Sequence, residues 1–296
     1  MFDNTWTRFD ERHDLNAGSD ESPIFLLAAG WRSGSTLLQR IIASSGEVLM
    51  WGEPYGRASI IPGLTRSAMA LRPERPEEGY AGWPHSGHFA PHQLADKPQD
   101  HWIANHFPPA QAFKQGFQAH LDALFSEPAK AQGAARWGLK EVRLHGMDGQ
   151  FLNWVYPKAR FVFLLRNPWD AWASAKGATW WLRWPDRKVE TAPEFAHHWR
   201  RLAQSFLEWP ADNGLLVRYE DLVRDSFDLA QISDHCGLTQ VQDVRSTVIR
   251  GMERPPSALS SFEVAQIDRV CGELARACCY DGPTGAVEDA PSFATV

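Results

Sequence analysis

The sequence AAGWRSGSTLLQR (residues 28–40) directly follows the apolar run PIFLL and decides the fold of the chain. A glycine-bearing turn that joins an apolar strand to an amphipathic helix directs backbone N–H groups at an anion above the sheet. Gly46 is placed to end this helix. The helix carries an apolar stripe made of Leu37, Leu38, Ile41 and Ile42. The stretch therefore predicts a strand, an anion-binding turn and a helix.

The loop differs from that of nucleotide triphosphatases, which reads G-x-x-x-x-G-K-[ST] and uses its lysine and hydroxyl on the outer phosphates and magnesium. Here three residues separate Gly30 from Gly34, and Ser35 stands in place of the lysine. Arg32, Ser35 and Thr36 supply one positive charge and two hydroxyl groups. The loop can hold an anion but lacks the parts for magnesium and a triphosphate. The structural alternative is a plain strand–helix turn with Ser35 as the N-cap.

Apolar runs and amphipathic stretches alternate along the chain. We expect strands at 24–29, 47–50, 136–141, 160–165 and 214–219. We expect helices at 35–45, 110–126, 168–177, 193–208, 220–235 and 262–279. Several runs are almost continuously apolar, as in strands covered on both faces. This order predicts an α/β fold that is P-loop-like, with three αβα layers around a central parallel sheet of about five strands and ligands at the carboxyl ends of the strands.

We expect residues 1–296 to form a single domain, because no linker or internal repeat divides them. Residues 1–22 are an acidic N-terminal extension, and residues 280–296 read as a loose tail. Two irregular segments, 72–109 and 178–192, are candidate lids over the acceptor. The second contains Trp180, Trp181 and Trp184, whose rings could stack on a sugar or an apolar acceptor, or could be ordinary core aromatics.

Composition excludes several classes of function. The chain of 296 residues is 44% hydrophobic and has a net charge of −6, which argues against a nucleic-acid partner. Neither a signal peptide nor a membrane anchor is visible, so we expect a cytoplasmic protein. The four cysteines lack paired C-x-x-C spacing, which argues against a disulfide framework or a zinc site. Clustered histidines without companion ligands favour a solvated lid over a metal site; they are His85, His88, His92, His101 and His106.

A second anion-binding pattern lies in RFVFLLRNPWDAWASAKG, residues 160–177. Its strand delivers Arg166 at the carboxyl end, Asn167 and Pro168 then start a helix, and Ser174 lies eight residues after the arginine. An arginine at a strand end can bind a phosphate through two hydrogen bonds, and the serine can add a hydroxyl. The alternative for Arg166 is a structural ion pair, for example with Asp170.

Together, RSGSTLL (32–38) and RNPWDAWAS (166–174) resemble the paired phosphate-binding signatures of sulfotransferases that use 3′-phosphoadenosine 5′-phosphosulfate (PAPS). The resemblance extends to WGEP (51–54), GLKEVR (138–143) and VRYEDLVRD (217–225). The arginine in the first loop makes this loop similar to that of the carbohydrate and tyrosylprotein branches of the family. The chain as a whole resembles the soluble, bacterial type. The resemblance implies PAPS as donor, its product 3′,5′-bisphosphate, and no required metal.

The resemblance also implies roles for single residues. The 5′-phosphosulfate would be held by Arg32, Ser33, Gly34, Ser35 and Thr36. The 3′-phosphate would be held by Arg166 and Ser174. Tyr219 would support the nucleotide pocket, or simply pack in the core. Arg250, Arg254 and Ser257 occupy the region of a loop that would fold over the donor, but their correspondence is not specific.

For catalysis, the resemblance points to Glu53 as the base and to Lys140, with Arg32, as cations around the transferred group. In-line sulfonyl transfer requires a base for the acceptor proton and positive charge around the sulfonyl group while it is transferred. An unshifted glutamate is a weak base, so either burial raises its pKa or the proton leaves late. The alternatives are a loop glutamate that caps a helix or pairs with Arg57, and a Lys140 paired with Glu141.

We therefore expect a sulfotransferase that acts on a hydroxyl group, or as a second choice an amine, of a small molecule, lipid or saccharide. Two other functions remain open: a P-loop nucleotide kinase-like enzyme, and an inactive nucleotide-binding protein. The first lacks its lysine and a clear Walker B acid, and the second would not need Glu53, Lys140 and Arg32 together. The sequence names neither the acceptor nor the oligomeric state.

Overall fold

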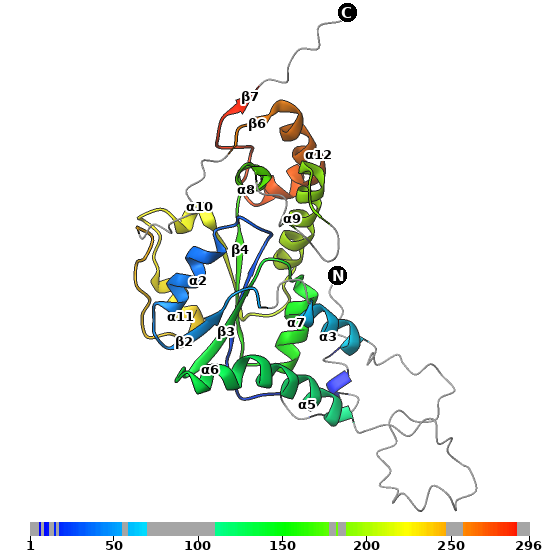
Figure 1. The fold of residues 1–296 in the computed structure, drawn as a ribbon, viewed down its shortest axis with the longest axis vertical. Coiled ribbons are helices and arrows are strands. Elements are labelled where there is room, and N and C mark those ends of the chain that lie inside the picture. Colours follow the sequence, from blue (N-terminus) through cyan, green and yellow to red (C-terminus); the bar gives the residue numbers. More distant parts are fainter. Residues whose placement is uncertain are drawn as a thin grey trace, which may run out of the picture.

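The computed structural model describes residues 6, 9–11, 15, 18–54, 59–69, 110–177, 182, 188–246 and 257–288. Its centre is a five-stranded parallel sheet in the order β2-β3-β1-β4-β5 (Figure 1). The strands are β1 (Ile24–Ala28), β2 (Val48–Trp51), β3 (Arg136–Glu141), β4 (Arg160–Leu165) and β5 (Gly214–Arg218). The predicted α/β class and five parallel strands are confirmed.

The central position of β1 follows from its sequence, because all five residues of IFLLA are completely buried between the neighbouring strands and the two helical layers. Phe25 of β1 packs against Trp137 of β3 and Phe161 of β4. The register pairs Leu27 with Glu141 and Ala28 with Leu164. The carboxyl ends of β3, β1 and β4 therefore meet at one edge of the sheet, where the site lies.

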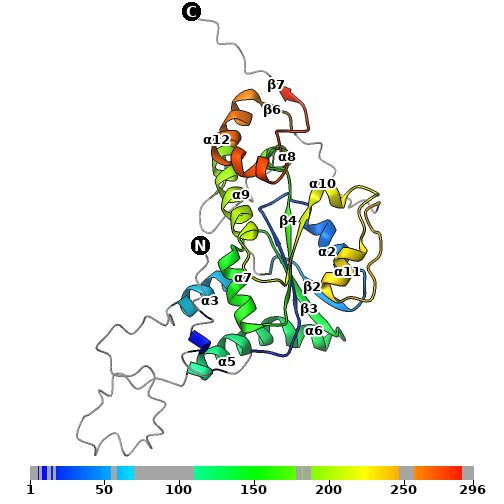
Figure 2. The same cartoon turned by 180° about the vertical axis from the view of Figure 1, so that it is seen from behind.

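Helices cover both faces of the sheet. Figures 1 and 2 show α2 (Ser35–Ala43) and α11 (Ala230–Cys236) on one side, and α7 (Gly146–Val155) and α9 (Ala192–Leu207) on the other. The other helices are α3 (Ile60–Met69), α5 (Ala110–Leu121), α6 (Glu127–Ala131), α8 (Pro168–Ala175), α10 (Tyr219–Leu222) and α12 (Ser261–Ala277). This arrangement confirms the three layers.

Two predicted helices differ from the structure. The helix expected over 220–235 is divided into α10 and α11 by the polar turn between them, where Asp228 Oδ1 accepts a hydrogen bond from Ala230 N at 2.9 Å. The helix expected over 110–126 contains α5 followed by a π-helical segment, Asp122–Ser126, before α6. Helix α7 was not predicted, because it is buried on most sides and lacks amphipathic periodicity.

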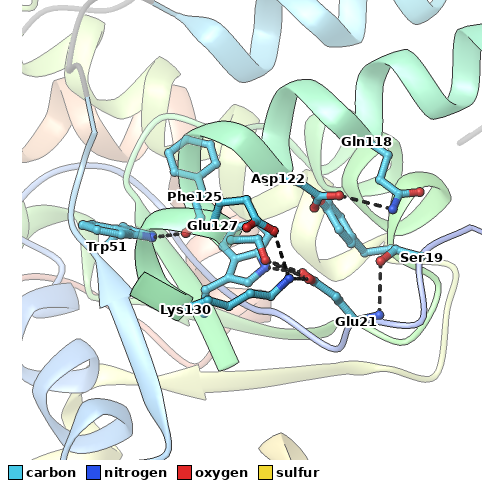
Figure 3. A network of polar contacts seen from close by, with 11 residues as sticks. Ser19, Glu21, Trp51, Gln118, Asp122, Phe125, Glu127 and Lys130 are labelled. Carbon is cyan, nitrogen blue, oxygen red and sulfur yellow. Dashed lines mark hydrogen bonds and ion pairs between the residues drawn. The ribbon is translucent and has the colours of Figure 1, made fainter. Parts of the chain in front are cut away.

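A polar network fastens the segment before β1 to the amino end of the sheet (Figure 3). Both Glu21 oxygens accept hydrogen bonds from Ser126 Oγ at 2.7 and 2.9 Å, and one accepts from Trp137 Nε1 at 2.8 Å. Lys130 Nζ forms an ion pair with the same carboxylate at 2.8 Å. Trp51 Nε1 donates to the carbonyl of Phe125 at 3.1 Å. The π-helical segment therefore contacts both the residues that precede β1 and the edge strand β2.

The tail expected to be loose from residue 280 makes specific hydrogen bonds as far as Thr284 and a short strand pairing as far as residue 288, while residues 284–287 are exposed. Tyr280 is buried and its hydroxyl donates to Glu220 at 2.9 Å, while Thr284 donates to the carboxylate of Asp170. A short parallel pairing joins β6 (Leu259–Ser260) to β7 (Val287–Glu288). The glycine and proline content of this segment suggested a free end, but specific side-chain contacts hold it against α8 and α10.

Several predictions concern residues outside the described part of the chain. These include residues 72–109 with their five histidines, the three tryptophans Trp180, Trp181 and Trp184, and the residues Arg57, Arg250 and Arg254. All four cysteines are described, and all are free thiols. None of the helices in the described ranges has the length and apolarity needed to cross a membrane.

Candidate active site

The turn between β1 and α2 has an unusual backbone. Gly30, Arg32 and Gly34 all have positive φ angles, of 90°, 60° and 86°. Glycine adopts this region without strain, whereas an arginine there costs about 1–2 kcal/mol. Gly34 is the N-cap residue of α2 and Ser35 is the first helical residue, so Ser35 is not the cap. Because the N-cap residue Gly34 has no side chain to cap the helix, the amino end of α2 carries its partial positive charge at the turn.

Tyr219 packs against this turn. It directly follows β5, and a Cβ atom added to Gly34 would lie 2.2 Å from Cδ2 of its ring. The guanidinium carbon of Arg166 lies 4.5 Å from the centre of the same ring. Tyr219 is half-buried and faces the pocket, which favours a place in the site over a role in the core alone.

The two predicted anion-binding elements contact each other directly. Arg166 Nη1 donates to the backbone carbonyl of Arg32 at 2.6 Å, and Arg32 Nε donates to Ser174 Oγ at 2.9 Å. Asn167 caps α8 by accepting from the amides of Trp169 and Asp170, as predicted. Arg166 is not paired with Asp170 here, since the Asp170 carboxylate accepts from Thr284.

The charges at this junction suit an anionic ligand. Burial and the nearby charge of Arg166 lower the pKa of the Arg32 guanidinium. Within the described residues, Arg166 Nε is buried without a hydrogen-bond partner. A buried cationic donor without an acceptor is costly, and a phosphate oxygen would satisfy it. The residues present therefore fit a ligand with phosphate groups.

Glu53 meets two cations at the carboxyl ends of β2 and β3. Its Oε1 lies 2.6 Å from Lys140 Nζ, and its Oε2 lies 2.6 Å from Arg143 Nη1. Lys140 is thus paired with Glu53 and not with its neighbour Glu141. Strands β2 and β3 are adjacent, so residues 87 positions apart come within hydrogen-bond distance. The structure brings the proposed base and the proposed cation together.

The two carboxylates in this cluster have opposite pKa shifts. Burial alone would raise the pKa of Glu53, but the charges and hydrogen bonds of Lys140 and Arg143 outweigh it and lower the pKa. Burial raises the pKa of Glu141 to about 7, and Arg143 at 3.4 Å only partly opposes this effect. Glu53 is therefore ionised and weakly basic in this arrangement, while Glu141 titrates near neutral pH.

The pocket at this edge has a volume of about 240 Å³. It is lined by Trp31, Arg32, Gly34, Ser35, Thr36, Leu37, Glu53, Val142, Arg166 and Tyr219. Three predicted site residues, Ser33, Lys140 and Ser174, do not line it. Ser33 is buried and its hydroxyl has no hydrogen-bond partner among the described residues. Ser257 is exposed, and its amide donates to the carbonyl of Ala173 on α8.

Four residues next to the site were not predicted as part of it: Arg143, Glu141, Trp31 and His198. The Trp31 ring stacks on His198 with ring centres 4.6 Å apart, and the Arg143 guanidinium carbon lies 5.6 Å from the Trp31 ring. Arg143 and Glu141 lie in the quoted stretch GLKEVR, where a run of charges directly after a buried strand is the available signal. His198 lies within helix α9, and its sequence gives no such signal.

The family model described as "Sulfotransferase family" matches residues 23–243. No curated protein matches the chain. Solved structures that are similar to this chain include sulfotransferases and sulfotransferase domains, at 13–21% identity.

Three of these structures represent different bacteria. The sulfotransferase domain of the Synechococcus PCC 7002 olefin synthase has 21% identity and a TM-score of 0.38, covering 76% of this chain and 77% of its own. STF9 from Mycobacterium avium has 15% identity and a TM-score of 0.43, covering 92% and 81%. A sulfotransferase from Alicyclobacillus acidocaldarius has 14% identity and a TM-score of 0.38, covering 84% and 96%.

Proposed function

The chain belongs to the sulfotransferase family, and we propose that it transfers the sulfonyl group of PAPS to a hydroxyl group of a small-molecule, lipid or saccharide acceptor. An amine is the second acceptor class. One observation carries the proposal: a carboxylate, Glu53, lines the same pocket as Arg32 of the turn after β1 and Arg166 at the end of β4.

The donor would lie along the junction of the two anion-binding elements. Arg32, Ser33, Gly34, Ser35 and Thr36 would hold the 5′-phosphosulfate, and Arg166 with Ser174 the 3′-phosphate. Two observations support this assignment: Arg166 Nε has no hydrogen-bond partner among the described residues, and Arg166 contacts Arg32. A nearby negative charge would stabilise both arrangements. Tyr219 would close the nucleotide side of the pocket. When bound, the donor supplies a sulfonyl group attached to a phosphate leaving group.

Glu53 would accept the proton of the acceptor hydroxyl, and Lys140 would stabilise the negative charge of the departing phosphate. Since Lys140 holds Glu53 Oε1 at 2.6 Å, the two roles are coupled. Turning the ammonium toward the donor would free Oε1 and remove one of the two cations that lower the Glu53 pKa. The base would thus become stronger when the donor is in place.

Two measurements separate this function from the alternatives. By calorimetry, we expect adenosine 3′,5′-bisphosphate to bind without magnesium, because the loop has no lysine to pair with a magnesium-bound triphosphate. Tight binding of ATP that requires magnesium would instead support the kinase-like alternative. A screen of phenols, alcohols, sugars and amines with labelled PAPS then tests turnover, and binding without any turnover would support the inactive protein.

The role of Glu53 is tested by the variant Glu53→Gln. We expect it to keep bisphosphate affinity and to lose about 100-fold or more in kcat, because only the proton acceptor is removed. Glu127→Gln, an exposed glutamate on α6, is the matched control and should keep full activity. Unchanged kcat in Glu53→Gln would remove Glu53 from the role of base.

A further inference from the structure

Arg143 is held on three sides by residues from three different strand ends. Its side chain is 9% exposed, and Nη1 lies 2.6 Å from Glu53 Oε2 after β2. The same nitrogen lies 3.4 Å from Glu141 Oε2 at the end of β3. Its guanidinium carbon lies 5.6 Å from the Trp31 ring, in the turn after β1. The guanidinium therefore has little freedom to move.

We infer that Arg143 is a positioning residue for Glu53: it fixes Oε2, so that Oε1 is the oxygen presented to Lys140 and to the acceptor proton. The inference rests on the proposed function of the site. It assigns different tasks to the two oxygens of one carboxylate, and it predicts that the two cations bound to Glu53 are not interchangeable.

The chemistry of the two cations supports this division. Lysine carries a compact charge on a flexible stem, whereas arginine presents a planar group that keeps its geometry. Glu53 has a cation on each of its two oxygens here, and both cations lower its affinity for a proton. If Lys140 turns to the donor, Arg143 remains as the anchor and the carboxylate keeps its orientation. Holding a base in line with the proton that it removes contributes strongly to the rate of an enzymatic reaction.

Glu141 lies beside this anchor, with its Oε2 at 3.4 Å from the same Nη1 atom that binds Glu53. The charged groups that act on Glu141 are Arg143, Glu53 and Lys140, and the amide of Val142 donates to it at 3.1 Å. When Glu141 loses its proton, its negative charge attracts Arg143 and raises the proton affinity of Glu53. Because burial raises the pKa of Glu141 to about 7, this change falls near neutral pH. We therefore expect kcat to rise as pH passes through about 7.

The test compares Arg143→Gln and Arg143→Lys with the wild type and with a control, Arg136→Lys. Arg136 begins the same strand at its opposite end, where it donates to the carbonyls of Ser22 and Cys236. The readouts are kcat and KM with labelled PAPS and the acceptor found in the screen, and bisphosphate affinity by calorimetry. We expect Arg143→Gln to lose about tenfold or more in kcat with bisphosphate affinity within about twofold of wild type.

The other variants sharpen the expectation. Arg143→Lys should recover part of kcat because the charge returns without the planar group, and Arg136→Lys should leave kcat unchanged. Wild-type kcat in Arg143→Gln would overturn the inference. Equal losses in kcat and bisphosphate affinity would also overturn it, because Arg143 would then support the donor site as a whole.

A second variant keeps the inference testable if Arg143→Gln does not fold. Glu141→Gln preserves shape and removes only the titration, so the rise of kcat near pH 7 should disappear while bisphosphate affinity stays the same. A wild-type profile in Glu141→Gln would overturn the link through Arg143. A wild-type protein that binds the bisphosphate but sulfonates no acceptor would overturn the proposed function, and this inference with it; an active wild type with unaffected variants would overturn the inference alone.

Discussion

Arg32 Nε donates a hydrogen bond of 2.9 Å to Ser174 Oγ, across 142 positions of sequence. This bond joins the turn after β1 to helix α8, and the bond from Arg166 to the Arg32 carbonyl joins them a second time. The two phosphate-binding elements therefore form one connected surface. A ligand that binds one element is expected to affect the geometry of the other.

Ser174→Ala should weaken binding of adenosine 3′,5′-bisphosphate by about tenfold, equivalent to about 1.4 kcal/mol. The variant removes the hydroxyl proposed for the 3′-phosphate and the restraint on Arg32 in one step. Calorimetry measures the affinity, and Ser67→Ala, an exposed serine on α3, is the control. An affinity equal to wild type would show that Ser174 only restrains the free protein.

Arg32→Gly should be more stable than Arg32→Ala, although both should lose sulfonyl transfer. The two variants lack the guanidinium equally, but only alanine retains the cost of φ +60°, about 1 kcal/mol. Thermal unfolding measures the difference, and single-turnover assays measure the loss. Equal unfolding midpoints would mean that the backbone of the turn relaxes when the arginine is removed.

Gly34→Ala should destabilise the protein more than Gly46→Ala. Both glycines have positive φ, of 86° and 75°, but a Cβ at Gly34 would meet the Tyr219 ring at 2.2 Å, whereas a Cβ at Gly46 would have no atom of the described residues within 4 Å. Gly46→Ala therefore measures backbone strain alone, about 1 kcal/mol. Urea unfolding should show the larger loss for Gly34→Ala.

The collision itself can be isolated by repeating Gly34→Ala in a Tyr219→Ala background. We expect the additional loss to disappear there, because the ring that obstructs the new methyl group is gone. An undiminished loss in that background would assign the whole effect to the backbone.

Stability should fall between pH 6.5 and 4 partly because of His198. Burial, together with the charge of Arg201, lowers the pKa of His198 to about 3 in the folded protein. The unfolded chain takes up this proton near pH 6.5, so each pH unit below that value costs the folded state about 1.4 kcal/mol from this group. Urea unfolding of His198→Phe at pH 7 and pH 5 should show a smaller loss than wild type.

Glu141 acts in the opposite direction over part of this range. Its raised pKa makes the folded protein bind a proton more readily between about 7 and 4.5, which favours folding as the pH falls. The comparison of His198→Phe with wild type cancels this contribution. An identical pH dependence in the two proteins would contradict the assignment to His198.

The sequence predicted the central strands well because they are buried on both faces. RFVFLL and IFLLAA are almost continuously apolar, and that pattern identifies β4 and β1 to within one residue. The apolar pattern does not predict the order of the strands in the sheet. The adjacency of β2 and β3 that joins Glu53 to Arg143 depends on the packing of the whole chain, so Arg143 could not be assigned from its neighbours.

The parts of the fold that the sequence did not predict depend on contacts that form no repeating pattern. Helix α7 starts at a capping box built on His145 and Asp148, and histidine is not a usual N-cap residue. The segment from Tyr280 onward is held by one hydrogen bond to Glu220 and two to Asp170, which leave no periodic trace in the sequence. Patterns that repeat are readable in a sequence, whereas contacts between isolated distant residues are not.

Strand β1 divides the pocket edge into two halves. On one side, β3 and β2 carry Lys140 and Glu53, and on the other, β4 and β5 lead to Arg166 and Tyr219. Acceptor chemistry and nucleotide recognition would then be separable traits: substitutions at the ends of β2 and β3 could change the preferred acceptor without altering the choice of donor. An engineer could diversify one half of the sheet while leaving the other untouched.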